Sequence, residues 1–267
     1  MSPIIALRHD VDTTFGLRYG LQKIVDIEEE YNVKSTIFIR ADILKSEADA
    51  LFLRRLEKRG WEIGLHLINT INSPDVLSPE KERDILQDRL GVKICGVTPC
   101  GSGVEDKGFT FSLPIRSFMQ SLAPCGLRTK DNGDTKWKVL DSLGLNYMEN
   151  YGLPPPWVKT FVLPTHLSFD IYYIRNFGVK HGYQRFRHDL TFTLKHHRIA
   201  TVLTHPEGFV RSVGMQFDNL WRYRTSKFFL TLVGKRKLDK VYQWFLSDFK
   251  GMKFMKYSDL CAHLKSY

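Results

Sequence analysis

The chain has 267 residues, of which 43% are hydrophobic and 25% are charged. This composition is typical of a globular protein with one large core and excludes a disordered or fibrous chain. The formal net charge of +10 favours anionic partners, but Lys and Arg are spread along the chain without a long basic run, which is typical of a solvated basic surface. No window approaches eighteen consecutive apolar residues, so no membrane span is expected.

The four cysteines, Cys95, Cys100, Cys125 and Cys261, form no CxxC pair, and their spacing fits no zinc finger. In a chain of this length such cysteines are typical of thiols in a reducing compartment. The N-terminal residues also lack the basic leader and the long apolar run of a signal peptide. We therefore expect a cytoplasmic protein.

The first third of the chain alternates between patterns typical of strands and patterns typical of helices. The helix predicted last in this part has a Ser78 cap, Pro79 at its first position and a stop at Gly91. In chain order, the pattern predicts a strand at 3–8, a helix at 17–31, a strand at 34–39, a helix at 48–60, a strand at 61–67, a helix at 78–91 and a strand at 92–97.

Residues 99–160 are richer in Gly and Pro and are predicted as a loop-rich insertion over one face of the fold. Alternation then returns, with a helix near 184–195, a strand at 199–205, a helix near 236–248, a short strand at 252–255 and a final helix at 257–267. Strand–helix alternation of this kind indicates parallel strands, in either a (β/α) barrel or a doubly wound sheet. No G-x-G-x-x-G follows the first strand, which argues against a dinucleotide-binding fold. We see no linker and predict one domain over residues 1–267.

Polar side chains follow three of the predicted strands. The first strand leads into His9, Asp10 and Asp12, the third into His66, and the late strand into His205. Because the carboxyl ends of parallel strands meet at one face, these carboxylates and imidazoles are expected to converge there. Oxygen and imidazole donors suit a divalent metal, with further groups left for proton transfer. The alternatives are that an aspartate caps the next helix and that each histidine is an ordinary loop residue.

Four stretches together resemble the polysaccharide deacetylase family, carbohydrate esterase family 4. They are "HDVD", "WEIGLHLINT", "TPCG" and "VLTHPEG", in that family's order and spacing. The resemblance covers nearly the whole chain, from Ile4 to the closing "MKFMKYSDL". It implies an α/β fold, a distorted (β/α) barrel of about seven parallel strands. It also implies hydrolysis of N-acetyl or related acyl groups on sugars with a divalent metal, usually zinc.

The resemblance assigns roles to four residues. Asp10 matches the general base that activates water, and Asp12 matches the metal-binding aspartate. His66 matches the first of two histidine ligands, and His205 matches the late histidine that acts as general acid toward the leaving amine.

The metal ligands depart from the family pattern at one position. Four residues after His66 the family has a second histidine, where this chain has Thr70, preceded by Asn69. Threonine is a poor zinc ligand and asparagine a weak one. A replacement ligand from elsewhere is expected, with His166 or Asp170 in "THLSFD" as the candidates.

A second departure concerns the arginine that orients the base in the family. The aligned position here is Val97 in "GVTPCGSG". Asp10 therefore lacks that partner unless another cation, such as Arg8 or Arg40, takes its place.

The leading hypothesis is a metal-dependent hydrolase that removes an N-acyl group from an amino sugar or related amide. The substrate is then an acylated sugar or glycan, which the positive charge would favour if it is anionic. No nucleic-acid partner is expected. The alternative is a non-catalytic carbohydrate-binding protein on the same fold. A metal-dependent enzyme of different chemistry also stays open, because fold does not fix function.

Overall fold

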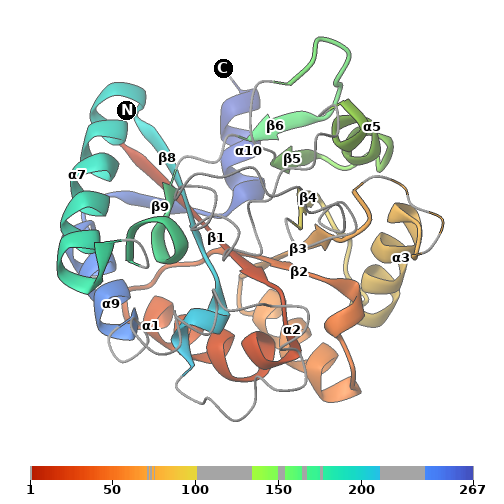
Figure 1. The fold of residues 1–267 in the computed structure, drawn as a ribbon, viewed down its shortest axis with the longest axis horizontal. Coiled ribbons are helices and arrows are strands. Elements are labelled where there is room, and N and C mark those ends of the chain that lie inside the picture. Colours follow the sequence, from red (N-terminus) through yellow and green to blue (C-terminus); the bar gives the residue numbers. More distant parts are fainter. Residues whose placement is uncertain are drawn as a thin grey trace, which may run out of the picture.

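The computed structural model describes residues 2–70, 72, 74, 76–100, 134–149, 154–163, 167–174, 177–210 and 238–266. Parallel strands form one curled sheet, and most of the helices pack around its outside, as Figure 1 shows. This arrangement is the open, curled sheet of a distorted (β/α) barrel, in agreement with the predicted fold class.

Within the described residues the sheet has nine strands in the order β6-β5-β4-β3-β2-β1-β8-β7, with β9 also paired to β1. Every pairing is parallel. The resemblance implied about seven strands, and four of the nine have only two or three residues. The strands are β1 (Ile4–Val11), β2 (Thr36–Ile39), β3 (Glu62–Leu67), β4 (Gly96–Pro99), β5 (Tyr147–Glu149), β6 (Phe161–Leu163), β7 (Leu167–Ser168), β8 (Ile199–Thr204) and β9 (Lys253–Met255).

Side-chain caps mark the starts of two helices, and a glycine marks the end of one of them. Ser46 caps α2 with a reciprocal capping box to Asp49, and Ser78 caps α3, which stops at Gly91 in the left-handed conformation (φ 63°). The α-helices are α1 (Leu21–Glu30), α2 (Glu47–Lys58), α3 (Pro79–Leu90), α5 (Asp134–Ser142), α7 (Val179–His197), α9 (Leu238–Asp248) and α10 (Tyr257–Lys265). Shorter helical turns are η1 (Gly16–Gly20), η2 (Ala41–Ile43), η4 (Phe169–Ile174) and η5 (Pro206–Phe209).

Several predicted elements have different bounds in the structure, among them β1, which continues past residue 8 to Val11. The helix expected over 17–31 is divided into the π-helical turn η1 and α1. The strand expected at 92–97 forms later, at Gly96–Pro99. The reason is that the backbone N–H of Ile94 donates to the side chain of Gln87 (3.0 Å), so pairing with β3 starts further along the chain. Most of the predicted insertion lies outside the described residues, but residues 134–149 contribute α5 and β5.

The central strand β1 separates two parts of the core. Its odd-numbered residues Ile5 and Leu7 pack in an apolar cluster with residues of α1, α7 and α9. Its even-numbered residues Ile4 and Ala6 pack with Phe38 and with α10 on the other face. Because side chains alternate along a strand, the even-numbered residues that follow on β1 lie on this second face, inside the curl of the sheet.

A buried carboxylate, Glu28 on α1, ties the helix layer to the back of β1. It is fully buried and accepts hydrogen bonds from Ser35 Oγ (2.8 Å), Trp61 Nε1 (2.7 Å) and Tyr242 OH (2.9 Å). His9 Nε2 lies 2.8 Å from Glu28 Oε1, and His9 Nδ1 contacts the hydroxyl of Thr204 on β8. His9 therefore has a structural role on the helix side of the sheet.

Glu82 on α3 holds the loop that follows β3. Its carboxylate accepts hydrogen bonds from the backbone N–H groups of Ile68 (3.0 Å) and Asn69 (2.8 Å). Burial raises the pKa of Glu82 to about 7, from an ordinary value of 4.5, against the opposing effect of these two hydrogen bonds.

The raised pKa of Glu82 predicts a pH-dependent stability. Between pH 4.5 and 7 the folded protein binds more protons at Glu82 than the unfolded chain, so the free energy of unfolding falls as the pH rises through this range. We expect Glu82→Gln to remove this contribution, which is on the order of 3 kcal/mol. Urea unfolding of both proteins at pH 5 and pH 8 measures it. Equal pH dependence in the two proteins would contradict the assignment.

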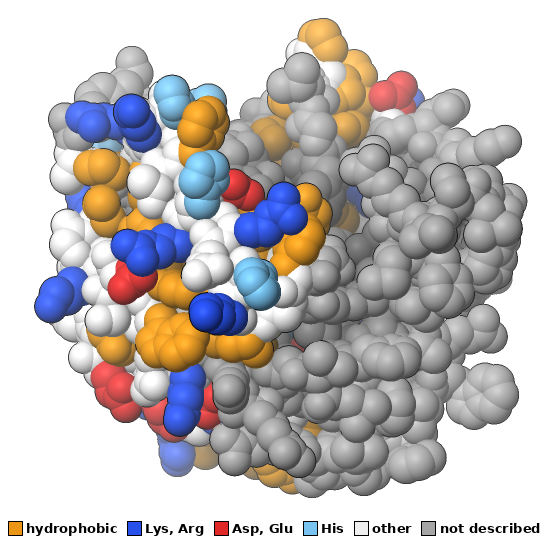
Figure 2. All heavy atoms as spheres, turned by 60° about the vertical axis from the view of Figure 1, so that its left-hand side comes forward, with side chains coloured by type: hydrophobic (Ala, Val, Ile, Leu, Met, Phe, Trp, Pro, Cys, Tyr) orange, Lys and Arg blue, Asp and Glu red, His pale blue; other side chains and the backbone are white. Residues whose placement is uncertain are grey.

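The outer face of α7 is strongly basic. Figure 2 shows Lys, Arg and His side chains gathered on this side of the molecule. The exposed basic residues of α7 are Lys180, His181, Arg185, Arg187, His188, Lys195, His196 and His197. Among the described residues, no helix combines the length and the apolar character needed to cross a membrane.

Candidate functional site

The site begins with three even-numbered residues of β1 and the turn after it. Arg8, Asp10 and Asp12 are two residues apart and therefore share the inner face of the sheet. Their exposed fractions are only 3%, 3% and 1%. Asp10 lies inside the strand rather than after it, since β1 extends to Val11. The helical segment after β1 begins at Thr14 and is capped by Thr13, whose Oγ1 accepts a hydrogen bond from the backbone N–H of Gly16 (2.9 Å), and not by either aspartate.

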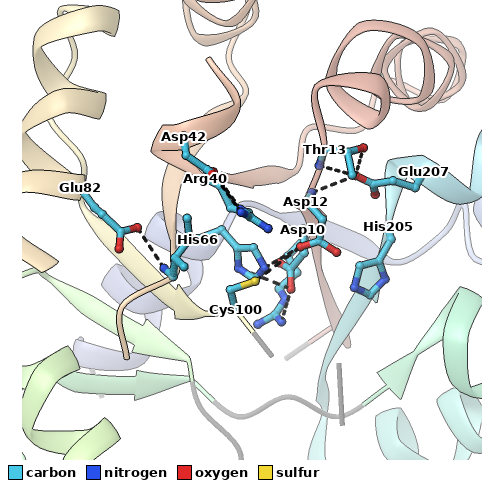
Figure 3. Close-up of polar contacts among 12 residues, drawn as sticks. Asp10, Asp12, Thr13, Arg40, Asp42, His66, Glu82, Cys100, His205 and Glu207 are labelled. Atoms are coloured by element: carbon cyan, nitrogen blue, oxygen red, sulfur yellow. Dashed lines mark hydrogen bonds and ion pairs between the residues drawn. The ribbon is translucent and has the colours of Figure 1, made fainter. Parts of the chain in front are cut away.

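Asp12, His66 and Cys100 bring three kinds of metal donor together. Asp12 directly follows β1, His66 lies in β3, and Cys100 directly follows β4. His66 Nε2 is 3.0 Å from Asp12 Oδ1, and Cys100 Sγ is 3.9 Å from the same oxygen. One donor atom from each residue lies within 4.8 Å of the others, and all three residues are buried. Figure 3 shows the three side chains directed toward one another.

Asp10 lies beside this group and is held by Arg8. Arg8 Nη2 donates to Asp10 Oδ2 (2.7 Å), while Arg8 Nη1 forms an ion pair with Glu149 on β5. His66 Nδ1 is 4.0 Å from Asp10 Oδ2. The other oxygen, Asp10 Oδ1, is buried without a hydrogen-bond partner among the described residues. Of the two cations considered for Asp10, Arg8 makes the contact, whereas Arg40 pairs with Asp42 (2.7 Å).

His205, at the end of β8, is paired with a carboxylate. Its ring atom Nδ1 lies 3.1 Å from Asp170 Oδ2, and its backbone N–H donates to the same oxygen (3.1 Å). Asp170, which was considered as a metal ligand, thus contacts His205. In Figure 3, Asp10 and Asp12 lie between His66 on one side and His205 on the other. His166 lies outside the described residues, so its assignment as a ligand stays a prediction.

Glu207 fixes the turn that carries Asp12. Its Oε1 accepts hydrogen bonds from the backbone N–H groups of Asp12 (2.9 Å) and Thr13 (2.8 Å) and from the Thr13 hydroxyl (2.9 Å). A side chain at Gly16 would collide with this carboxylate, which explains the glycine there. Glu207, which follows β8, therefore positions the backbone of the turn that follows β1.

The electrostatics of the group favour a bound cation. Burial lowers the pKa of His66, but the charge interactions with Cys100 and Asp10 and the hydrogen bonds to Asp12 and Cys100 outweigh it and raise that pKa well above its ordinary value. Burial likewise raises the pKa of Glu149 to about 7, although Arg8 opposes this. The charges that favour a proton on His66 would equally favour a divalent metal.

The donors present fit a divalent metal. Carboxylate, imidazole and thiolate are all zinc ligands, and catalytic zinc sites use three protein ligands and leave a position open. Two buried atoms beside the group, Asp10 Oδ1 and His66 Nδ1, have no hydrogen-bond partner among the described residues. The sequence interpretation missed Cys100, although "TPCG" places it directly after β4, as Asp12 and His205 directly follow β1 and β8.

Comparison with known proteins supports the fold. No protein-family model and no curated protein matches the sequence. Among solved structures, a putative polysaccharide deacetylase from Mycobacterium smegmatis is similar to it, with 13% identity and a TM-score of 0.59 over 100% of this chain and 94% of that chain.

Two further structures are similar at a TM-score of 0.51. One is the Xyl-CE4 domain of a multidomain xylanase from the hindgut metagenome of Trinervitermes trinervoides, with 14% identity over 99% of this chain and 92% of that chain. The other is a mutant of a CE4 family pseudoenzyme from Bacillus anthracis, with 17% identity over 97% of this chain and 67% of that chain. The chain therefore has the fold of the polysaccharide deacetylases of carbohydrate esterase family 4.

Proposed function

We propose that the protein is a metal-dependent hydrolase that removes an N-acyl group, such as acetyl, from an amino sugar. The observation that carries this proposal is the position of Asp10: its Oδ2 lies 4.0 Å from His66 Nδ1, and its Oδ1 is buried without a hydrogen-bond partner among the described residues. Asp12 and His66 would hold the metal. When bound, a divalent metal polarises the amide carbonyl and lowers the pKa of water.

The protein's own side chains would then move the protons. Asp10 takes a proton from the water whose oxygen attacks the amide carbonyl carbon. His205 gives a proton to the sugar nitrogen as the C–N bond breaks, so that a carboxylic acid and a free amine leave. The Asp170 carboxylate orients the His205 ring and stabilises its protonated form, which makes Nε2 the donating atom.

The substrate and the location belong to the same proposal. An acylated amino sugar or glycan is the substrate class implied by the resemblance, and the basic outer face of α7 would favour an anionic one. The cytoplasmic location rests on the cysteine usage of the sequence, because cysteines outside CxxC pairs in a chain of this length are typical of a reducing compartment.

Release of acetate from an N-acetylated amino-sugar oligosaccharide tests the function. The full chain is loaded with zinc or cobalt, and acetate and primary amine are measured together. We expect the two products in equal amounts, with loss of both after treatment with a chelator. His66→Ala is the control that removes a proposed ligand.

The alternative, a non-catalytic carbohydrate-binding protein, rests on Thr70 and Val97, which replace residues of the family pattern. It predicts glycan binding that is insensitive to chelator and no release of acetate from the same oligosaccharides. That result would favour the alternative over hydrolysis.

Arg8 provides a prediction about positioning. Because Arg8 also pairs with buried Glu149, its effect is measured in a Glu149→Gln background, where removing Arg8 no longer leaves the charge of Glu149 without its partner. Adding Arg8→Met is expected to lower kcat by about 10- to 100-fold because Asp10 loses the group that orients it, while KM and metal content change little.

Partial recovery of kcat by added guanidinium ion would support the positioning role of Arg8. An unchanged kcat in the double variant, compared with Glu149→Gln alone, would contradict it.

A further inference from the structure

The backbone fixes Cys100 beside the proposed metal ligands. The β3–β4 pairing places His66 opposite Thr98 and Leu67 opposite Pro99. One residue further on, the backbone N–H of Cys100 donates to the carbonyl of Leu67 (2.7 Å). This hydrogen bond extends the ladder past the end of β4 and sets the Cys100 side chain next to that of His66.

The side chain of Cys100 is buried beside those of Asp12 and His66. Cys100 has no exposed surface, and its sulfur lies 3.9 Å from the carboxylate oxygen of Asp12. A thiolate and a carboxylate together carry two negative charges, and neutral imidazole carries none. These three donors would neutralise a divalent cation, which matters in a buried site because an uncompensated charge there is costly.

The loop that would supply the family's second histidine is held on α3. Ile68 and Asn69 donate their backbone N–H groups to Glu82, and the Asn69 amide donates to the carbonyl of Leu77 (2.8 Å). Figure 3 shows Glu82 on the far side of His66 from Asp12 and Cys100. The third donor beside Asp12 and His66 thus comes from the end of β4.

We propose that Cys100 is the third protein ligand of the metal, bound as a thiolate. The inference rests on the proposed metal site and deepens it. Sulfur is a soft ligand, so this donor set should retain zinc and cobalt in preference to magnesium and manganese. The thiol proton is released when the metal binds.

Cobalt titration of the full chain tests the proposal with the metal alone. Sulfur bound to Co²⁺ gives a near-ultraviolet charge-transfer band, so the wild type is expected to show this band at one cobalt per chain. Cys100→Ser is expected to lose the band and to bind cobalt at least tenfold more weakly, in the range found when groups around a metal site are altered. Cys261→Ser, another buried cysteine with the same substitution, is the matched control and should behave as wild type.

Two further variants separate the possible ligands. Cys100→Asp keeps the charge but removes the sulfur, so it should bind cobalt without the band even if Cys100→Ser folds poorly. His166→Ala should keep the band.

Cobalt bound without the band in the wild type would overturn the role of Cys100 while leaving the proposed hydrolase intact. The same holds if the band is retained in Cys100→Ser. Absence of cobalt binding in the wild type would overturn the metal site as a whole.

Discussion

Replacing Asp10 with Asn is expected to lower turnover by about 10³-fold or more without changing the fold or the metal content. The amide has nearly the same shape and can still accept the hydrogen bond from Arg8, but it cannot take a proton from water. The measurement is acetate release by the metal-loaded variant, with circular dichroism and metal content recorded on the same sample.

Asp26→Asn is the control for Asp10→Asn, because Asp26 is exposed on α1 and bonded to Gln22. It should retain wild-type turnover. Full activity in Asp10→Asn would show that Asp10 is not the base, whatever the metal content proves to be.

Replacing Glu28 with Ala is expected to reduce the free energy of unfolding by about 3–5 kcal/mol. The variant leaves the donors Trp61, Ser35 and Tyr242 buried without their acceptor, and it removes the charge that faces His9. Equilibrium unfolding in urea measures the change.

Glu30→Ala is the matched control for Glu28→Ala, since Glu30 lies on the same helix but is exposed. It should change the free energy of unfolding by less than about 1 kcal/mol. A similar small effect for Glu28→Ala would mean that water or neighbouring groups satisfy the network without the carboxylate.

Much of the fold was predictable because local signals and burial agree. Helix α3 was predicted almost to the residue, since Ser78, Pro79 and Gly91 mark its ends independently of any tertiary contact. The strand β4 begins later than predicted because the backbone N–H of Ile94 donates to the side chain of Gln87, a hydrogen bond that no pattern of apolar residues encodes.

The candidate site is predictable from the sequence because residues near the carboxyl ends of parallel strands converge on one face. In the structure, Asp12 and His66 are in contact and Asp10 lies beside them. The same rule applies to Cys100 after β4, whereas the spacing of the cysteines in the sequence gives no sign of a metal site. Spacing detects ligands on one loop and fails when each ligand comes from a different strand.

The partner of Asp10 could be narrowed to a few cations but not chosen from the sequence. Arg8 is two residues before Asp10 on the same strand, and the period of two places both side chains on one face. Arg40 follows the neighbouring strand β2 but pairs with Asp42. Which arginine contacts Asp10 therefore depends on the position of each arginine along its strand and on the carboxylate nearest to it.

The metal content of the purified full chain tests the central claim most directly. We expect about one zinc or cobalt ion per chain by mass spectrometry after incubation with the metal and removal of the excess, and close to none in His66→Ala. A wild-type chain that retains no metal under these conditions, while folded by circular dichroism, would contradict the account.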